Sequence, residues 1–132
     1  MSERTLRTAI FAVAAVNLAI GLFAAIAPGA FYEEVGTYGA ENGHYVGDVA
    51  AFYLAAGVGL VIAALRPSWR VPMLAVVAFW WALHALNHLG DIEQASSDGK
   101  GISDTILIAA GAAAIGYLGW VASRDQVARD SG

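Results

Sequence analysis

The sequence predicts an all-α integral membrane protein that folds as an antiparallel four-helix bundle with up-down-up-down topology. Hydrophobic residues make up 58% of its 132 residues and charged residues only 14%, whereas soluble domains usually carry about 25% charged residues. Four uncharged apolar runs each approach the roughly 20 residues that a helix needs to cross a bilayer. These runs show no strict alternation of polar and apolar residues, so the strands of a membrane barrel are a poor alternative. We place the spans, in a single domain over 1–132, at about 8–27, 48–65, 71–89 and 104–122.

The first two spans are bounded by residues that stop or start helices. Pro28 and Gly29 follow the first apolar run and end the first helix. The second helix begins either by Gly43 or, with Asp48 as its N-cap, directly after that residue. The connection between the two helices, 28–47, is too long for a simple turn.

The last two spans have similar boundary signals. Two prolines bracket a tight turn at 67–72, and Gly90 stands where a helix C-terminus favours glycine. A polar, flexible link follows at 96–101, with Ser103 or Asp104 as the natural cap of the fourth helix. Because short links join consecutive helices, neighbouring helices in the sequence should be antiparallel neighbours in space.

Charged residues divide unequally between the two ends of the predicted bundle. Six of the seven basic residues lie at one end, namely Arg4, Arg7, Arg66, Arg70, Arg124 and Arg129. The connections at the other end hold Lys100 and seven acidic residues, namely Glu33, Glu34, Glu41, Asp91, Glu93, Asp98 and Asp104. Because cytoplasmic loops are enriched in Lys and Arg, both termini should be cytoplasmic and the acidic connections on the extracytoplasmic side of the cell membrane. No basic patch with interleaved aromatic residues indicates nucleic-acid binding.

Two pairs of polar residues lie near the extracytoplasmic ends of two neighbouring helices. His84 and His88 are four residues apart at the end of the third helix, and His44 and Asp48 repeat that interval at the start of the second. This interval places both side chains of a pair on one helical face, about 6 Å apart along the axis. Because the pairs lie at matching depths on neighbouring helices, the sequence predicts that they converge in one pocket. Ionisable residues inside a membrane are costly unless they are paired, hydrated or metal-bound.

The residue types of this site favour a divalent transition metal. Three imidazoles and one carboxylate, in a chain without cysteine, suit zinc or another first-row ion such as iron, manganese or copper, and disfavour calcium. We take zinc as the first candidate. With His44, Asp48, His84 and His88 all bound to one ion, the site would be closed and structural. With three ligands, a water would occupy the fourth position and Asp48 would be the candidate base. Haem is less favoured, because no second deep histidine is available.

Each of these residues also has a structural interpretation, in which no metal is bound. Asp48 would cap its helix, and His88 suits a helix C-terminus, where positive charge is stabilised. His84 would be satisfied by a hydrogen bond to Asp48 or Asn17. The alternative to a metal site is therefore a metal-free His/Asp hydrogen-bond network.

Aromatic residues surround the predicted site in the sequence. Tyr38 and Tyr45 fit an aromatic belt at the membrane surface or a cover over the pocket. Trp80 and Trp81 come shortly before His84 and suit either a slot for a lipid or quinone or ordinary packing against lipid. The aromatic pattern alone leaves both interpretations open.

The polar residues also carry a resemblance to a known family. The run from Asn42 to Val49, followed by an apolar helix, an Arg-Pro link and the pair His84 and His88, resembles small uncharacterised four-helix membrane proteins of actinobacteria, broadly DoxX-like. The resemblance covers about 8–122 and implies the four-helix fold, but no settled activity. Leu83 stands where the resemblance would place a proline.

Two classes of function follow from the sequence. The first is a metal-dependent membrane protein, such as an enzyme acting on a lipid, a quinone or a small molecule. The second is a non-catalytic membrane subunit or binding protein whose His/Asp network only fixes the bundle. A proton-coupled transporter is a weaker third class, because the first helix offers only Asn17 and no acidic residue. A homo-oligomer is left open.

Overall fold

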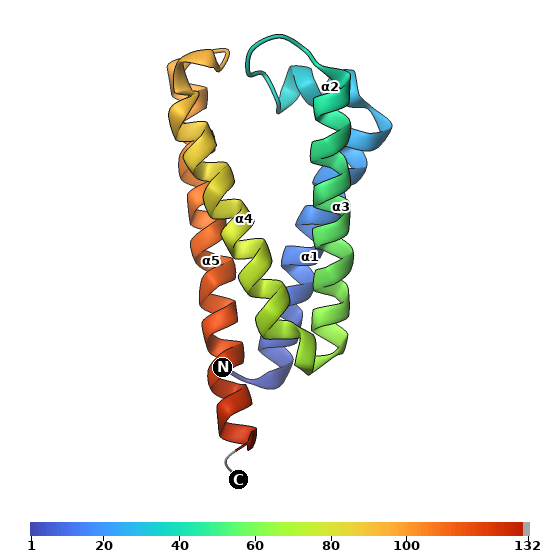
Figure 1. Cartoon of the computed structure of the whole chain (residues 1–132), viewed down its shortest axis with the longest axis vertical. Helices are drawn as coiled ribbons and strands as arrows, with labels where there is room; N and C mark the ends of the chain where they lie inside the picture. Colours follow the sequence, from blue (N-terminus) through green and yellow to red (C-terminus); the bar gives the residue numbers. More distant parts are fainter. Residues whose placement is uncertain (131–132) are drawn as a thin grey trace.

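The computed structural model describes residues 1–130, with side chains to residue 128, as four long helices joined by shorter ones (Figure 1). The long helices are α1 (Glu3–Ile26), α3 (Gly43–Leu65), α4 (Arg70–Gly90) and α5 (Asp98–Asp130). The connections contain a short helix and two single turns, α2 (Pro28–Glu34), η1 (Pro67–Trp69) and η2 (Ile92–Gln94). The predicted all-α class is confirmed. Four helices are long and apolar enough to cross a bilayer, as expected of a multi-pass membrane protein.

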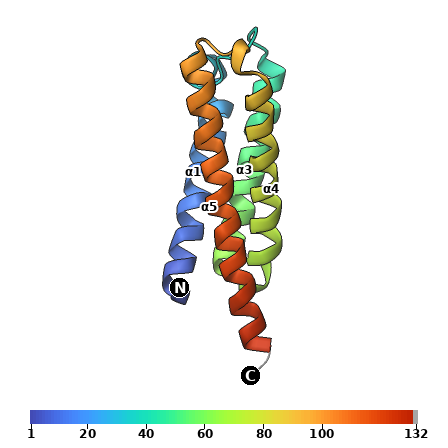
Figure 2. The ribbon, with the colours of Figure 1, turned by 90° about the vertical axis from the view of Figure 1, so that its left-hand side faces the viewer.

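The long helices pack as two pairs. Helix α1 lies along α3 and α4 lies along α5, whereas contacts between the pairs are much sparser. Figure 1 shows the pairs meeting at one end and diverging at the other. We call the first the closed end, formed by η1 and the beginning of α1, and the second the open end, formed by α2, residues 35–42 and η2. Figure 2 shows the last turns of α5 extending beyond the other helices at the closed end.

Glycines allow the helices within each pair to approach closely. A Cβ atom at Gly57 of α3 would lie only 2.6 Å from the side chain of Leu18 in α1, and one at Gly21 would lie 2.9 Å from the backbone of Leu54. Gly111 of α5 gives the same room to Trp81 of α4. In lipid, where burial of apolar surface between helices contributes little, such close packing holds helices together.

An ion pair with a buried arginine joins the two helix pairs at the closed end. The side chain of Arg70, at the start of α4, is 2% exposed. Its guanidinium donates two hydrogen bonds, of 2.8 and 2.6 Å, to the carboxylate of Glu3 at the start of α1. Its Nε donates a third, of 3.3 Å, to the carbonyl of Ala63. Because a bidentate pair fixes both distance and orientation, it holds α4 against α1.

A buried amide links the pairs at mid-height. Asn17 of α1 is fully buried, and its Nδ2 donates a 2.9 Å hydrogen bond to the carbonyl of Val13. Its Oδ1 accepts a 3.3 Å hydrogen bond from the indole nitrogen of Trp81 in α4. Apolar side chains fill the bundle between this contact and the closed end, among them Leu6, Ile10, Leu60, Leu74 and Val77.

Helix α3 begins before Asp48, and Asn42 is its N-cap. The Oδ1 of Asn42 accepts hydrogen bonds of 3.1 and 3.2 Å from the amides of His44 and Tyr45. The alternative in which Asp48 caps this helix is therefore wrong. The uncharged run marks only the part of the helix that hydrocarbon would surround, and a capped helix continues beyond it.

Helix α5 also begins earlier than the sequence predicted. The Oγ of Ser97 accepts a 3.2 Å hydrogen bond from the amide of Lys100, so the helix is capped there. Ser103 and Asp104 lie within the helix instead, and both bond to Lys100 one turn earlier. The polar composition of 96–101 suggested a flexible link, but Ser97 provides the local hydrogen bond that starts a helix.

Candidate functional site

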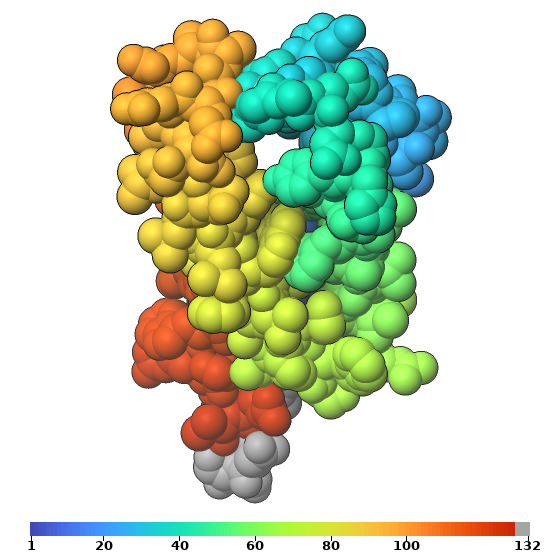
Figure 3. All heavy atoms as spheres, turned by 45° about the horizontal axis from the view of Figure 1, so that its top comes forward, coloured from blue at the N-terminus to red at the C-terminus, as the bar shows by residue number. Residues whose placement is uncertain are grey.

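A cavity of about 540 Å³ lies between the two helix pairs at the open end. Residues of α1, α3, α4, α5 and the connections at that end all line it. Figure 3, in which this end is turned forward, shows the molecular surface hollowed between the beginning of α3 and the end of α4. The divergence of the helix pairs therefore produces a chamber of ligand size.

Two aromatic residues of α3 form one wall of the cavity. Tyr45, Val49 and Tyr53 all line it, and they are spaced four residues apart along one face of the helix. Trp81 lines it from α4, and its indole nitrogen is held by Asn17. The deep part of the cavity is therefore aromatic and apolar.

His84 and His88 line the same cavity from α4. Their ring centroids are 4.7 Å apart with the planes at 83°, so the predicted shared face is confirmed. His84 stacks on Trp80 with the ring centroids 5.2 Å apart. His88 meets the ring of Tyr38 edge-on at 4.5 Å. Neighbouring aromatic rings therefore hold both imidazoles in position.

The Nδ1 atom of His88 is buried without a hydrogen-bond partner among the described residues. Buried polar atoms are nearly always satisfied in folded proteins, so an orphaned one calls for a missing partner. Because His88 lines the cavity, a molecule bound there is a suitable source of that partner.

His44 and Asp48 do not line this cavity. The Nε2 of His44 lies 3.7 Å from the Oδ2 of Asp48, so these two residues do form a pair on one helical face. Their side chains are 90% and 71% exposed, however. Residues 45, 49 and 53 face the cavity instead, and an offset of one residue turns a side chain by about 100° around a helix.

The four predicted metal ligands therefore form two separate pairs. Among the described residues, no three His, Asp or Glu side chains lie close enough to hold one metal ion. His84 and His88 still present two imidazoles to one cavity. A transition metal at these two residues stays a prediction. Its other ligands would not be His, Asp or Glu side chains of the described residues.

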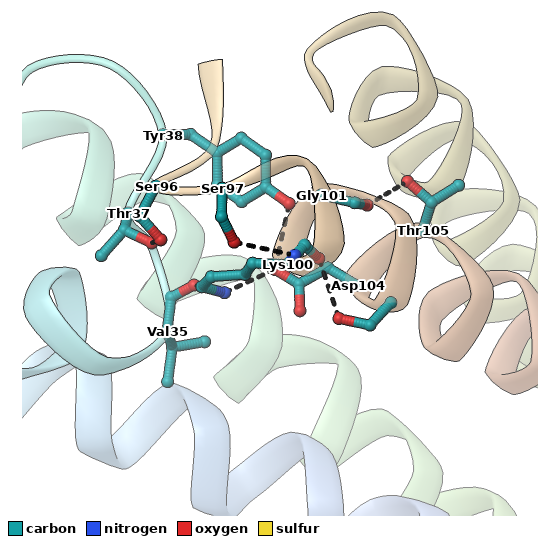
Figure 4. A network of polar contacts seen from close by, with 10 residues as sticks. Val35, Thr37, Tyr38, Ser96, Ser97, Lys100, Gly101, Asp104 and Thr105 are labelled. Carbon is teal, nitrogen blue, oxygen red and sulfur yellow. Dashed lines mark hydrogen bonds and ion pairs between the residues drawn. The ribbon is translucent and has the colours of Figure 1, made fainter. Parts of the chain in front are cut away.

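A polar network crosses the mouth of the cavity (Figure 4). The Nζ of Lys100 in α5 donates hydrogen bonds of 2.5 Å to the carboxylate of Asp104 and 3.0 Å to the carbonyl of Val35. The hydroxyl of Tyr38 donates a 3.0 Å hydrogen bond to the same carboxylate. Burial and this hydrogen bond to Asp104 raise the pKa of the Tyr38 phenol above its ordinary value, so the hydroxyl stays a donor at alkaline pH as well.

Backbone contacts reinforce the network. The amide of Gly39 donates a 3.2 Å hydrogen bond to the carbonyl of Gln94, and Tyr38 pairs with Ala95 in an isolated antiparallel bridge. Gly39 has a φ of 66°, which glycine adopts without strain. We call residues 35–42 the strap, because they tie the α1/α3 pair to the α4/α5 pair over the cavity.

Tyr53 and Asp104 line the cavity but are not among the site residues predicted from the sequence. For Tyr53 a signal was present, since Tyr45, Val49 and Tyr53 follow the spacing of one helical face. Asp104 was assigned to a helix cap, although it lies four residues after Lys100, the only basic residue of its end. Such a pair commonly forms on a helix.

No family model, curated protein or solved structure matches this chain. The fold and the cavity define a multi-pass helical membrane protein with a chamber between two helix pairs. The DoxX-like resemblance stays a prediction.

Proposed function

We propose that this protein binds a small amphipathic molecule in the cavity at its open end. The observation that carries the proposal is the cavity itself, whose volume of about 540 Å³ falls within the roughly 300 to 1,000 Å³ typical of small-molecule sites. Such sites combine an apolar lining with a few polar groups that orient the ligand. Here Val49, Tyr53 and Trp81 supply the lining, and His84 and His88 supply the polar groups.

The membrane is the proposed source of the ligand. The strap and its contacts with α5 cover the end of the cavity, while α3 and α4 make few contacts with each other. The hollow in Figure 3 lies between these two helices. A ligand dissolved in the bilayer would enter there sideways, with its apolar part leading.

We further propose that the chain crosses the cell membrane four times in alternating directions, with both termini cytoplasmic and the cavity near the extracytoplasmic face. Exposed arginines gather at or near the closed end, at positions 4, 7, 66 and 124, and acidic residues at the open end. Loops rich in Lys and Arg stay in the cytoplasm. Arg129, also counted in this bias, has a side chain outside the described residues.

Sidedness has a direct test, because the chain contains no cysteine. We expect a membrane-impermeant maleimide to label Ser97→Cys at the open end of intact cells and to label Ser68→Cys at the closed end only after lysis. The reverse pattern would contradict the proposed orientation.

A metal-dependent enzyme acting on a lipid, a quinone or another small molecule is the second candidate. It is favoured by the adjacent imidazoles of His84 and His88 and by the partnerless Nδ1 of His88. In this candidate, the two histidines hold a divalent transition ion, zinc first, and the substrate occupies the same cavity. Without a metal, the same residues serve the binding function alone.

Native mass spectrometry of protein extracted from its own membranes tests the binding function. Val49→Trp fills the cavity, whereas Val58→Trp adds the same side chain to the 52% exposed surface of the same helix. We expect a small molecule of constant mass to accompany the unchanged protein and Val58→Trp, and to be lost from Val49→Trp. Retention of that molecule by Val49→Trp would refute binding in this cavity.

A further inference from the structure

We infer that the cavity selects amphipathic amines, molecules with an apolar body and a protonated amino head. This inference names the ligand class of the proposed binding function and rests on it. Three features of the site carry it, namely the charge of the lining, the aromatic rings beside that charge and the partnerless Nδ1 atom of His88.

The charged residues that line the cavity are acidic. Asp91 and Asp104 both line it, and among the described residues no lysine or arginine does. Lys100 balances the charge of Asp104. Asp91 accepts hydrogen bonds of 3.2 and 2.8 Å from the neutral amides of Asn87 and Gln94, which leave its negative charge in place. The lining therefore has a net negative charge to offer a bound cation.

Acidic residues on the surface around the cavity add to its negative electrostatic potential. The acidic residues at this end outnumber the single basic residue, Lys100, and include Glu33, Glu34, Glu41, Asp48, Glu93 and Asp98. Clefts lined by one sign of charge raise the local concentration of the opposite ion. Anionic amphiphiles are repelled by the same field, so the site discriminates by charge before contact.

Aromatic rings stand where a cationic head would lie. Tyr38 and Tyr45 line the cavity, and the ring of Tyr38 meets that of His88 edge-on at 4.5 Å. The faces of such rings attract cations, and aromatic cages recognise substituted ammonium groups in this way. The ammonium of Lys100, which is paired with Asp104, lies 5.7 Å from the centroid of the Tyr38 ring.

The head group also has to suit His88. With its ring proton on Nε2, His88 presents the partnerless Nδ1 as an acceptor, which requires a donor. A protonated amine donates hydrogen bonds, whereas carboxylate and sulfonate heads only accept them. A single head group that carries positive charge and donates hydrogen bonds thus meets the needs of Asp91, the aromatic rings and His88 together.

Three probes with one body and different heads test the inference, phenylbutylamine, phenylbutanol and phenylbutanoate. Binding to the full chain in phosphatidylcholine nanodiscs is measured by equilibrium dialysis, with empty nanodiscs as the blank. We expect the amine to bind roughly tenfold more tightly than the alcohol and the anion to bind most weakly. Val49→Trp should abolish the binding of all three, whereas Val58→Trp should not.

Charge variants isolate the acidic contribution. Asp91→Asn should remove most of the preference for the amine over the alcohol and leave the affinity for the alcohol unchanged. Glu93→Gln, an exposed neighbour outside the lining, is the matched control and should change neither. Asp104→Asn frees Lys100 at the mouth and should lower the affinity for the amine relative to the alcohol, which keeps the test independent of any effect of Asp91 on folding.

The outcomes separate the inference from the proposed function. If the alcohol binds and the amine binds no better, the inference is overturned while the binding function stands. If none of the probes binds above the empty nanodiscs, both fall. Amine binding that survives Val49→Trp would place the amine elsewhere and overturn the inference.

Discussion

At the closed end, Arg70 and Glu3 join the two helix pairs through a bidentate ion pair, whereas at the open end Tyr38, Lys100 and Asp104 join them across a cavity. The ion pair lies where the two helix pairs are in contact. The polar network connects them where they have diverged, over the cavity. The polar residues of the closed end therefore serve stability, and those of the open end are free to serve binding and access.

The boundary between the two regions lies at Trp81. Its indole nitrogen bonds to the buried Asn17, and its ring lines the cavity. Between Trp81 and the closed end, small and apolar side chains pack continuously. Between Trp81 and the open end, the helix pairs diverge. The cavity is thus a consequence of where the tight packing stops.

Loss of the ion pair at the closed end should have the largest effect on stability. Glu3→Ala leaves the 2% exposed guanidinium of Arg70 without its bidentate partner. Removing one member of a fully buried pair costs roughly 3 to 5 kcal/mol, and because Glu3 is 57% exposed we expect about 2 kcal/mol here. Thermal unfolding in detergent measures the loss. Arg4→Ala, an exposed neighbour, should be nearly neutral, and equal melting of the two variants would contradict a structural role for the pair.

Packing within a helix pair should tolerate little added volume. Gly57→Ala forces α3 away from Leu18 of α1, and we expect a loss of about 1 to 2 kcal/mol, as for other overpacked sites. Gly116→Ala is the matched control, because nothing lies within 4 Å of a Cβ atom at that position. The ratio of folded to unfolded protein in a denaturing-detergent titration distinguishes them. A stable Gly57→Ala would show that α1 and α3 are less tightly packed than described.

Opening the strap should alter access more than stability. Tyr38→Phe removes the hydrogen bond to Asp104, at an expected cost of about 1 kcal/mol or less. A water-soluble maleimide should then label a cysteine placed at Val49, which is half-buried and lines the cavity, several times faster. Tyr32→Phe removes a hydrogen bond within the same end, to the carbonyl of Gly39, and should leave the labelling rate unchanged. Equal rates in both variants would mean that Tyr38 does not close the mouth.

The smallest effect is expected for the histidine outside the cavity. If the second candidate function holds, elemental analysis of purified protein should find a transition metal that His84→Ala and His88→Ala lose and His44→Ala retains. His44→Ala should also leave the melting temperature unchanged, because its side chain is 90% exposed. Loss of the metal in His44→Ala alone would move the site to the surface pair.

Much of the fold could be predicted from the sequence, because each uncharged apolar run marks a helical segment that a bilayer would surround. The shared face of His84 and His88 was equally predictable from helical spacing. The rotation of α3 about its own axis could not be predicted. The spacing of His44 and Asp48 places these two residues on one face of α3, but it does not say whether that face is turned toward α4. That rotation is set by close contacts such as Gly21 with Leu54, which the apolar pattern leaves unspecified.

The contacts of the strap and the ion pair of the closed end could not be predicted from the sequence, for a different reason. Tyr38 and Asp104 are 66 residues apart in sequence, and Glu3 and Arg70 are 67 apart. Contacts at such separation depend on how the two helix pairs are placed. In the sequence, Arg70 was counted only among the basic residues of its end, although it is buried.

Photo-crosslinking with a diazirine analogue of phenylbutanol tests the central claim most directly, that the open end encloses a binding site between the two helix pairs. Crosslinks should fall on both walls of the cavity, on α3 near Tyr53 and on α4 near His84, and excess phenylbutanol should suppress them. Crosslinks confined to the exposed faces of the helices, and unaffected by the competitor, would contradict the account.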